Sequence, residues 1–396
     1  MKPLQQLGAK IDARDVCVGV MGLGYVGLPL AVGFAKAGVA VIGFDLDEQK
    51  VRSIQDGVSY IEDVPTRELA DARAAGKLRA TSDFGELALC DVINVCVPTP
   101  LTKTRDPDFS YIVRAVEDIA KCLRAGQLVI LGSTTYPGTT HELYVPMLEA
   151  GGLKAGEDFA IAFAPERIDP ANKQFAVHEV PKVVGGETPL CTDLATRVFQ
   201  LVFDRIVPVS STQSAEMVKL LENTFRAINI GLANEIALMC ERLGLDVWEV
   251  IDAAATKPYG FMKFQPGPGL GGHCIPVDPA YLSWKMRSLN FQARFIDLAT
   301  EINGQMPRYV ADRIADLLNQ DRIAVNGAKI LILGVAYKSN VSDMRESPAL
   351  DVMRLLAQKG AEIQYSDPHV RELDLDGTTY KSADLSDDLL RKVDLA

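Results

Sequence analysis

Apolar runs of strand length alternate with longer amphipathic stretches over the first half of the chain. The apolar runs are nearly continuous in hydrophobic residues and fall at 16–21, 39–45, 91–98, 128–133 and 159–165. Such runs are typical of strands in a parallel sheet that is covered on both faces. The stretches at 27–37 and 109–123 have the pattern of helices that cross between parallel strands. The alternation therefore predicts a doubly wound α/β domain.

A long helical pattern replaces this alternation near residue 211. It covers 214–243 and ends at Gly244, a residue type that commonly follows the last turn of a helix. Residues 259–278 are rich in glycine and proline and show no regular period. An irregular stretch of this length inside a compact region is uncommon and is often functional. Further helices are predicted at 247–255, 281–287 and 295–319.

A second α/β unit is predicted from residue 329 onward. Strands at 329–333 and 362–365 flank a helix at 347–359, and residues 385–396 have the pattern that leads into a further strand. Three strands barely meet the minimum for an open sheet, so we expect the sequence to lack its natural C-terminus. The chain is predicted to be α/β, with two Rossmann-like doubly wound parallel-sheet domains joined by a long central helix and a helical domain. The expected domains are 1–210, 211–322 and 323–396.

Composition and charge exclude several classes of protein. The chain has 396 residues, of which 48% are hydrophobic and 23% are charged, as in globular proteins of two or three domains. Its net charge is −11 and it shows no basic stripe, so no nucleic acid is expected as a partner. No apolar run reaches the length of a membrane span, and residues 1–15 lack the core of a signal peptide.

Cysteine and histidine usage bears on compartment and metal binding. The 7 cysteines are scattered and form no CxxC pair, which favours a reducing cytoplasm over a disulfide framework. The 4 histidines form no ligand cluster with cysteine, so no metal site is predicted. Three cysteines lie in or beside apolar strands and are expected to be inert core residues, namely Cys17, Cys90 and Cys96.

The first predicted strand leads directly into a glycine-rich turn. Gly22, Gly24 and Gly27 form the GxGxxG pattern between this strand and a helix. The glycines allow a tight turn and the close approach of a pyrophosphate to the helix N-terminus. Asp45 ends the second strand, where its carboxylate is placed to accept hydrogen bonds from ribose hydroxyls and to repel a 2′-phosphate. NAD is therefore favoured over NADP. The alternative, a glycine turn that closes an ordinary βα unit, is disfavoured by this register of strand, helix and acid.

Other polar positions carry a weaker signal when each is taken alone. The segments 97–100 (VPTP) and 133–134 follow predicted strands at the sheet edge where ligands bind, although proline and hydroxyl residues also end strands without a function. The long helix carries Lys219 and Asn223, which share one face because they are four residues apart. Glu216 lies near this stripe. Taken alone, the helix predicts a solvated face.

The irregular segment contains a cysteine in an unusual setting. Cys274 follows two glycines, which let a substrate approach its thiol closely. A nearby cation such as Lys219 would lower the pKa of this thiol and increase its thiolate fraction. A zinc site at His273 and Cys274 fails for want of further ligands. Cys274 is thus a candidate nucleophile, and an unreactive cysteine is the alternative.

Taken together, these motifs resemble those of the nucleotide-sugar 6-dehydrogenases, the family of UDP-glucose and GDP-mannose dehydrogenases. The resemblance covers nearly the whole chain and rests on six segments in the family's order: GLGYVGLPLA from Gly22, VPTP from Val97, APER from Ala164, EMVKLLENTFRAINIGLANE from Glu216, GGHCIPVDP from Gly271 and GVAYKSNVSDMRESPA from Gly334. Residues 261–285 are most similar to the branch that oxidises UDP-N-acetylglucosamine. UDP-glucose enzymes usually have other residues at the positions of His273 and Val277.

The resemblance implies an NAD site and a UDP-sugar site. Family positions of the NAD site match Gly22, Gly24, Tyr25, Val26, Gly27 and Asp45. Loops beside the nicotinamide match Pro98, Thr99, Ser133 and Thr134, the last grouped with the catalytic residues, and Arg345 matches a cofactor-contacting arginine. The backbone of 261–269 would hold the uridine diphosphate. The implied substrate-binding residues are Phe261, Phe264, Gly267, Gly269, Gly271 and Lys338.

The resemblance also implies catalytic roles. Cys274 matches the nucleophile and Asp278 its supporting carboxylate, while Lys219 and Asn223 match the pair that stabilises the oxyanion. Glu166 matches a carboxylate near the reacting carbon and its water. The implied reaction converts the sugar C6 alcohol to an acid with two NAD, through an aldehyde, a thiohemiacetal and a thioester on the cysteine. The thiolate is needed because an aldehyde must become tetrahedral before it can give up a second hydride.

Two functions of other classes stay open. A one-step dehydrogenase of the β-hydroxyacid type shares the NAD domain and a lysine-bearing helix but needs no cysteine, and a non-catalytic NAD-binding protein needs no catalytic set at all. Within the family, UDP-N-acetylmannosamine, UDP-glucose and GDP-mannose are alternative substrates. Members commonly pair through the long helix, so we expect a homodimer. The apolar Leu220, Ile228 and Leu232 could equally be intramolecular core.

Overall fold

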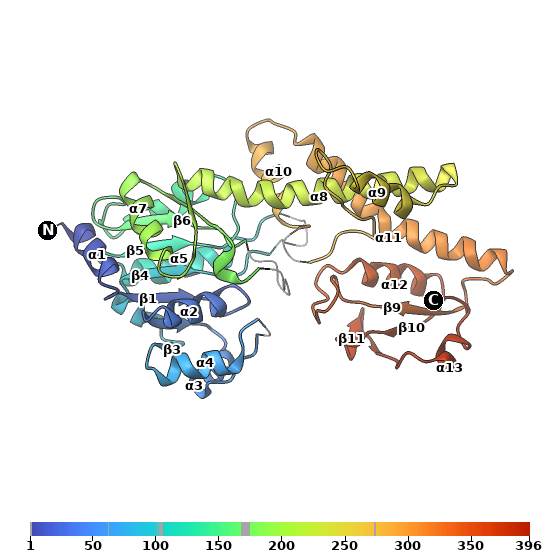
Figure 1. The fold of residues 1–396 in the computed structure, drawn as a ribbon, viewed down its shortest axis with the longest axis horizontal. Helices are drawn as coiled ribbons and strands as arrows, with labels where there is room; N and C mark the ends of the chain where they lie inside the picture. The colour runs from blue at the N-terminus through green and yellow to red at the C-terminus, as the bar shows by residue number, and fades with distance from the viewer. Residues whose placement is uncertain (1, 62, 101, 103–105, 168–174, 273–274) are drawn as a thin grey trace. The chain divides into compact units, whose positions relative to one another are not determined.

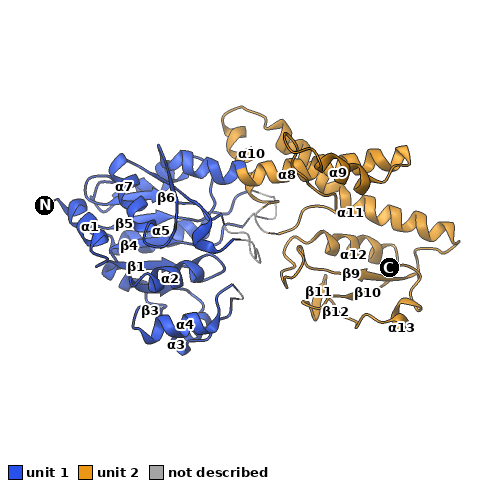
Figure 2. Cartoon of the chain, viewed as in Figure 1, with its two compact units in different colours: residues 1–221 blue, residues 222–396 orange. Residues whose placement is uncertain are grey.

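The computed structural model describes residues 1–396 except 1, 62, 101, 103–105, 168–174 and 273–274. It divides into two compact units, Met1–Leu221 and Glu222–Ala396 (Figure 2). The division falls within helix α8 (Thr212–Leu243), which contributes to both units (Figure 1). The predicted α/β class is confirmed. The finer division into 1–210, 211–322 and 323–396 stays a prediction.

One sheet forms the centre of the first unit. Within the described residues it has eight strands in the order β3-β2-β1-β4-β5-β6-β7-β8. All neighbouring strands are parallel except β6 and β7. The strands are β1 (Cys17–Met21), β2 (Ala40–Phe44), β3 (Leu78–Thr81), β4 (Val92–Val95), β5 (Leu128–Leu131), β6 (Ala160–Phe163), β7 (Lys182–Gly186) and β8 (Ile206–Val209). The apolar runs predict five of them.

Helices cover both faces of this sheet and bury two separate cores (Figure 1). Successive residues of one strand face opposite cores, as Val41 and Ile42 do on β2, which explains why the strands are apolar throughout. One core is shared with α1 (Pro3–Asp12), α2 (Gly27–Lys36), α3 (Glu48–Asp56), α4 (Thr66–Ala74) and α7 (Pro189–Phe199). The other is shared with η1 (Phe84–Leu89), α5 (Ser110–Cys122), η2 (Thr140–Tyr144) and α6 (Val145–Glu149). A short turn, η3 (Val177–Glu179), precedes β7.

The second unit joins helices to a small α/β part. After α8 come α9 (Val247–Ala255), α10 (Asp278–Ser288) and α11 (Arg294–Gln320). Strands β9 (Lys329–Leu333) and β10 (Glu362–Ser366) pair in parallel and are connected through α12 (Pro348–Gln358). An antiparallel pair follows, β11 (Glu372–Leu375) and β12 (Thr378–Lys381). Residues 385–396, which are expected to lead into a further strand, form α13 (Asp387–Leu390) and then a parallel bridge from Leu395 to Ile330 of β9.

The two units use the same device where their first strand ends. Gly22 follows β1 with φ of 88°, and Gly334 follows β9 with φ of 85°. Asp45, at the end of β2, accepts a hydrogen bond at 2.8 Å from the N–H of the residue after Gly22. Asp367, just after β10, accepts one at 2.9 Å from the N–H of the residue after Gly334. The repeated turn and carboxylate show that both units contain a Rossmann-like strand–turn–helix–strand arrangement.

Candidate active site

The turn between β1 and α2 has the geometry that its glycines predict. A Cβ added to Gly22 would lie 2.6 Å from a backbone carbonyl oxygen beyond β4, and one added to Gly27 would lie 1.8 Å from the carbonyl oxygen of Gly22. Around Gly24 no described atom lies within 4 Å of an added Cβ. Tyr25 is exposed, and Val26 is the N-cap of α2. The outer glycines are therefore required by the fold, whereas Gly24 leaves room for a ligand.

Asp45 is buried at the end of β2, and other groups of the protein use part of its hydrogen-bonding capacity. Its carboxylate accepts hydrogen bonds from the Leu23 N–H at 2.8 Å, the Asp47 N–H at 2.9 Å and the Lys50 ammonium at 3.3 Å. A carboxylate offers about four lone-pair sites, so acceptor capacity is left for a hydroxyl. The open turn at Gly24 and this acceptor together fit the adenosine end of NAD.

The loops after β4 and β5 are tied together at the carboxyl edge of the sheet. The buried Ser133 donates a hydrogen bond from Oγ to the Val97 carbonyl at 2.7 Å. Pro98 and Thr99 continue the first loop, and the half-buried Thr134 continues the second. The structure thus brings together the four residues expected beside the nicotinamide.

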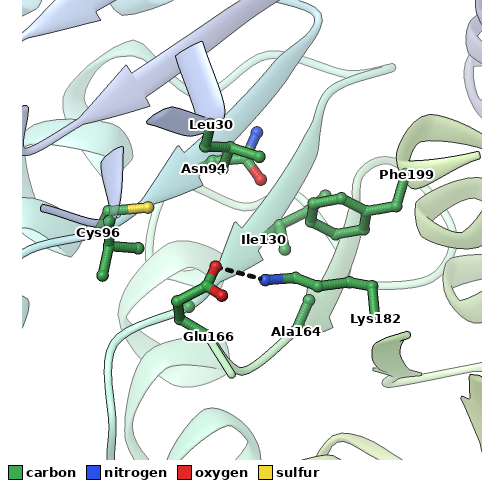
Figure 3. A pocket seen from close by; sticks show the side chains of 10 residues that line it. Leu30, Asn94, Cys96, Ile130, Ala164, Glu166, Lys182 and Phe199 are labelled. Carbon is green, nitrogen blue, oxygen red and sulfur yellow. Dashed lines mark hydrogen bonds and ion pairs between the residues drawn. The ribbon is translucent and has the colours of Figure 1, made fainter. Parts of the chain in front are cut away.

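Glu166 lies at the carboxyl end of β6, beside a small cavity (Figure 3). Its Oε2 accepts a hydrogen bond from the Lys182 ammonium at 3.0 Å, and its Oε1 accepts one from the Arg167 N–H at 2.7 Å. The side chains of Lys182 and Glu166 are only 4% and 12% exposed. Sequence reasoning missed Lys182. The available signal was a lysine at the start of the apolar run KVVGG, since buried lysines almost always have a charged partner.

Glu216 on α8 is also buried, so the expected solvated face is wrong at this position. Its carboxylate accepts hydrogen bonds from the Gly138 N–H at 2.5 Å, the Thr140 N–H at 2.9 Å and the Thr140 hydroxyl at 2.6 Å. Burial raises the pKa of Glu216 to about 7, against the lowering effect of these three donors. Glu216 therefore anchors the first turns of α8, where the half-buried Lys219 also lies, to the segment that follows β5.

The predicted catalytic residues of the second unit are placed only in part. Cys274 lies outside the described residues, as does His273. Asn223 on α8 donates a hydrogen bond from Nδ2 to the carboxylate of Asp278, which is buried at the first position of α10. The structure therefore brings together the predicted oxyanion donor and the predicted supporting carboxylate.

The glycine-rich segment before Cys274 packs against the loop that follows β9. A Cβ added to Gly271 would lie 2.6 Å from the Tyr337 Cβ. The Gly272 N–H donates a hydrogen bond to the Arg345 carbonyl at 3.1 Å. Glycine is required at both positions, because Gly272 also has a φ of 82°.

A buried amide pair fixes the middle of this segment. Asn234 on α8 accepts a hydrogen bond from the Gly267 N–H at 2.8 Å and donates one from its Nδ2 to the side-chain Oδ1 of Asn303 at 2.8 Å. Both asparagines are at most 4% exposed. The ring of Phe264 meets that of Phe225 edge-on, with centroids 5.9 Å apart. Two of the expected substrate-binding residues are thus held by α8.

The remaining predicted residues of this site lie on more exposed backbone. Phe261 is exposed, and Gly269 has a φ of 138°. Lys338 is half-buried, and the exposed Arg345 forms a bidentate ion pair with Asp343 at 2.5 Å. Arg345 is therefore engaged by a neighbouring carboxylate in this structure.

Metal-ligand clusters and membrane-spanning helices are both absent from the part of the chain that the structure describes. No group of three or more His, Cys, Asp or Glu side chains there is placed to hold a metal ion. No helix built from those residues is both long and apolar enough to cross a membrane.

Known protein families account for all three parts of the chain. The NAD-binding domain of the UDP-glucose/GDP-mannose dehydrogenase family matches residues 16–203, the central domain matches 213–305 and the UDP-binding domain matches 331–396. The chain belongs to the UDP-glucose/GDP-mannose dehydrogenase family. It is an NAD-dependent nucleotide-sugar dehydrogenase, and the predicted family, enzyme class and cofactor are confirmed.

Relatives of similar sequence identity are named for different sugar substrates. UDP-N-acetyl-D-glucosamine 6-dehydrogenase of Pseudomonas aeruginosa is 38% identical over 90% of this chain and 84% of its own length. UDP-N-acetyl-D-mannosamine dehydrogenase of Pyrococcus horikoshii is 37% identical over 89% and 84%. The solved structure of the Pyrococcus horikoshii UDP-D-ManNAc dehydrogenase aligns with a TM-score of 0.88 at 35% identity, covering 96% of this chain and 88% of that one. Family membership therefore leaves the sugar unresolved.

Proposed function

We propose that this dehydrogenase oxidises the C6 hydroxyl of UDP-N-acetylglucosamine to the uronic acid in a four-electron reaction. Two observations support this sugar: residues 261–285 are most similar to that branch, and the Pseudomonas aeruginosa relative with that name is 38% identical. UDP-N-acetylmannosamine is the second candidate, because the relative named for it is 37% identical. UDP-glucose and GDP-mannose are further alternatives.

The first unit holds the cofactor in this proposal. NAD, when bound, supplies the acceptor for each of the two hydrides. The open turn at Gly24 and the N–H groups at the start of α2 bind its pyrophosphate, because a helix N-terminus favours negative charge. Asp45 accepts from the ribose hydroxyls. Ser133 holds the loops that position the nicotinamide by bonding one loop to the other.

Covalent catalysis by Cys274 is the second element of the proposal. Its thiolate adds to the C6 aldehyde, and the resulting oxyanion is stabilised by Lys219 and Asn223. The observation that carries this assignment is the hydrogen bond from Asn223 to the buried Asp278. It fixes the amide plane and uses one of the two N–H donors, which leaves the other for an oxyanion. Loss of one such donor typically slows catalysis about 100- to 1000-fold.

Water activation is the third element. Glu166 and Asp278 are the candidate carboxylates for the hydrolysis of the thioester. Asp278 is 2% exposed and bonded to Asn223, which supports Glu166 as the group that takes the proton from water.

The uridine diphosphate is assigned to the backbone of 261–269, with Lys338 and Gly271 as further contacts. The hydrogen bond from Gly267 to the buried Asn234 supports this role, because it fixes the loop without using a side chain of the loop itself. Arg345 is assigned to the cofactor.

We also propose that the enzyme is a cytoplasmic homodimer that pairs through α8. Phe225, Leu232 and Met239 are seven residues apart, share one face of the helix and are 47%, 54% and 48% exposed. Leu220 is buried and belongs to the intramolecular core, whereas Leu232 does not. Ile228 is half-buried. The described cysteines are all free, which supports a reducing compartment.

The test of the substrate is a comparison of kcat/KM for the four nucleotide sugars with NAD in excess. We expect UDP-N-acetylglucosamine to exceed each of the others by about 10-fold or more, because unmatched polar groups in a buried site are penalised. A higher kcat/KM for UDP-N-acetylmannosamine would keep the mechanism and contradict the sugar assignment. Equal values for UDP-glucose would show that the N-acetyl group is not recognised.

A further inference from the structure

A small cavity in the first unit lies at the carboxyl ends of β4, β5 and β6 (Figure 3). Its volume of about 10 Å³ is enough for one water molecule. Three polar side chains line it, those of Asn94, Glu166 and Lys182. The Nδ2 of Asn94 is buried and has no hydrogen-bond partner among the described residues. Buried amides rarely lack a partner, so the cavity is suited to a bound water.

Lys182 is held in place from several sides. Figure 3 shows its side chain reaching past Phe199 toward Glu166, with the ion pair between them drawn. Its Nζ lies 3.0 Å from the Glu166 Oε2, 5.3 Å from the centroid of the Phe199 ring and 5.4 Å from that of Phe203. Burying both charges costs solvation free energy, and this cost is opposed by their mutual attraction and by the contact of the ammonium with the two aromatic faces. An ion pair of this kind is weak evidence for stability and stronger evidence for a function.

We propose that Lys182 is a positioning residue of the reaction, which holds the Glu166 carboxylate at this cavity in the orientation that accepts a proton from water. The inference rests on the proposed function, in which Glu166 activates the water that hydrolyses the thioester. Lys182 holds one carboxylate oxygen, and the Arg167 N–H holds the other at 2.7 Å. With both oxygens held, the remaining lone pairs point in fixed directions.

The step balances without any further reactant. The water oxygen bonds to the acyl carbon as one of its protons passes to the Glu166 carboxylate. The carbon–sulfur bond breaks, its electron pair stays on the Cys274 sulfur, and a carboxylic acid is released. No electrons are gained or lost at this stage. The ammonium of Lys182 favours the ionised carboxylate that this transfer requires.

Two other described residues near Glu166, Cys96 and Arg167, differ from Lys182 in their contacts. Burial raises the pKa of the Cys96 thiol to about 12, so it lines the cavity as a neutral group. The guanidinium of Arg167 donates a hydrogen bond to the Pro181 carbonyl at 2.7 Å. Helices α2 and α7 contribute apolar side chains to the cavity.

The test compares Lys182→Met with Lys182→Arg. The measurements are the pH profile of kcat and the fraction of enzyme with an acyl group on Cys274 during turnover, read by mass spectrometry after an acid quench. For Lys182→Met we expect kcat to fall about 10- to 100-fold and the acylated fraction to rise. The acid limb of the profile should move up by about 1–3 pH units, because a neighbouring cation is lost. Lys182→Arg keeps the charge and should restore most of the activity.

A double variant keeps the test valid if Lys182→Met, which leaves Glu166 unpaired in the interior, is too unstable. The combination of Glu166→Gln with Lys182→Met removes both charges. If Lys182 acts only through Glu166, its replacement adds no further loss of kcat to Glu166→Gln. A further loss by the same factor as in the wild-type background overturns the proposal.

The outcomes separate this inference from the proposed function. An enzyme that oxidises a UDP-sugar and shows the same pH profile and acylated fraction with Lys182→Met overturns the role of Lys182 alone. A wild-type enzyme that forms one NADH per sugar, or that keeps its activity with Cys274→Ala, overturns the proposed function, and the inference falls with it.

Discussion

Two buried charged side chains, Lys182 and Glu216, connect the elements around the candidate site of the first unit. Lys182 leaves β7 to reach the loop after β6, and Glu216 leaves α8 to reach the segment after β5. Neither pairing follows from sequence, because both partners are distant along the chain. The only sequence signal is a charged residue inside or beside an apolar run. The pairing of these buried charges is therefore visible in the structure and not in the sequence.

The buried Glu216 makes the free energy of unfolding depend on pH, and a substitution at this position removes that dependence. Its pKa is raised to about 7 in the folded state, above its usual value of 4.5. The folded protein therefore binds more protons than the unfolded chain between these pH values, and this contribution to stability is lost as pH rises toward 7. The nearby charge is Glu142, which raises the pKa further. Glu216→Gln has no proton to lose.

We expect Glu216→Gln to be less stable than the wild type at pH 5, because its amide group faces the N–H donors of Gly138 and Thr140. The difference in unfolding free energy between the two proteins should narrow by about 2–3 kcal/mol toward pH 8, because the wild-type Glu216 loses its proton. Denaturant unfolding of both proteins across this range measures the difference, with Glu249→Gln at an exposed position as the control. A stability difference that stays constant with pH would contradict the raised pKa of the buried Glu216.

The local sequence pattern predicts a strand when both of its faces are buried and its residues are all apolar. The strands β1, β2, β4, β5 and β6 are apolar on both faces and were predicted, whereas β3, β7 and β8 are interrupted by polar or proline residues such as Arg79, Lys182 and Pro208 and were not. Helix α1 was also missed, although Leu4, Leu7 and Ile11 recur at helical spacing and are buried.

The residues of the candidate site divide in the same way, into those that a local pattern predicts and those that depend on a partner far along the chain. The glycine turn and Asp45 were predicted because strand, turn and acid lie within one local unit. Asn223 and Asp278 are candidates from the family resemblance alone, and their hydrogen bond, between residues 55 apart, was not predicted. The Asn234–Asn303 support of the substrate loop was missed, because an asparagine within a helix carries no sign of its distant partner.

The glycines of the β1–α2 turn separate a folding role from a binding role. Gly27→Ala should destabilise the protein, because its Cβ would lie 1.8 Å from the Gly22 carbonyl oxygen. Gly24→Ala has open space, so its unfolding temperature should match that of the wild type while its Kd for NAD rises about 10-fold or more. Gly304→Ala on α11 also has open space and serves as the control with unchanged Kd. Unaltered NAD binding by Gly24→Ala would contradict the turn as the pyrophosphate site.

In the proposed dimer, a second copy of the chain covers the exposed apolar side chains of α8. Leu232→Glu places a charge among these side chains, so the Kd for dimerisation should rise about 100-fold, the size of a typical hot-spot effect. Sedimentation over a range of concentrations measures it. Leu89→Glu replaces an equally exposed leucine on η1 and should leave the dimer intact. A wild-type protein that sediments as a monomer at high micromolar concentration would contradict the assignment.

We propose that one active site performs both oxidations through Cys274. The most direct test is the amount of NADH formed when UDP-N-acetylglucosamine is limiting and NAD is in excess, beside a Cys274→Ala control. We expect two NADH per sugar for the wild type, a yield that the variant does not reach. One NADH per sugar from the wild type, or an unchanged yield from Cys274→Ala, would contradict it.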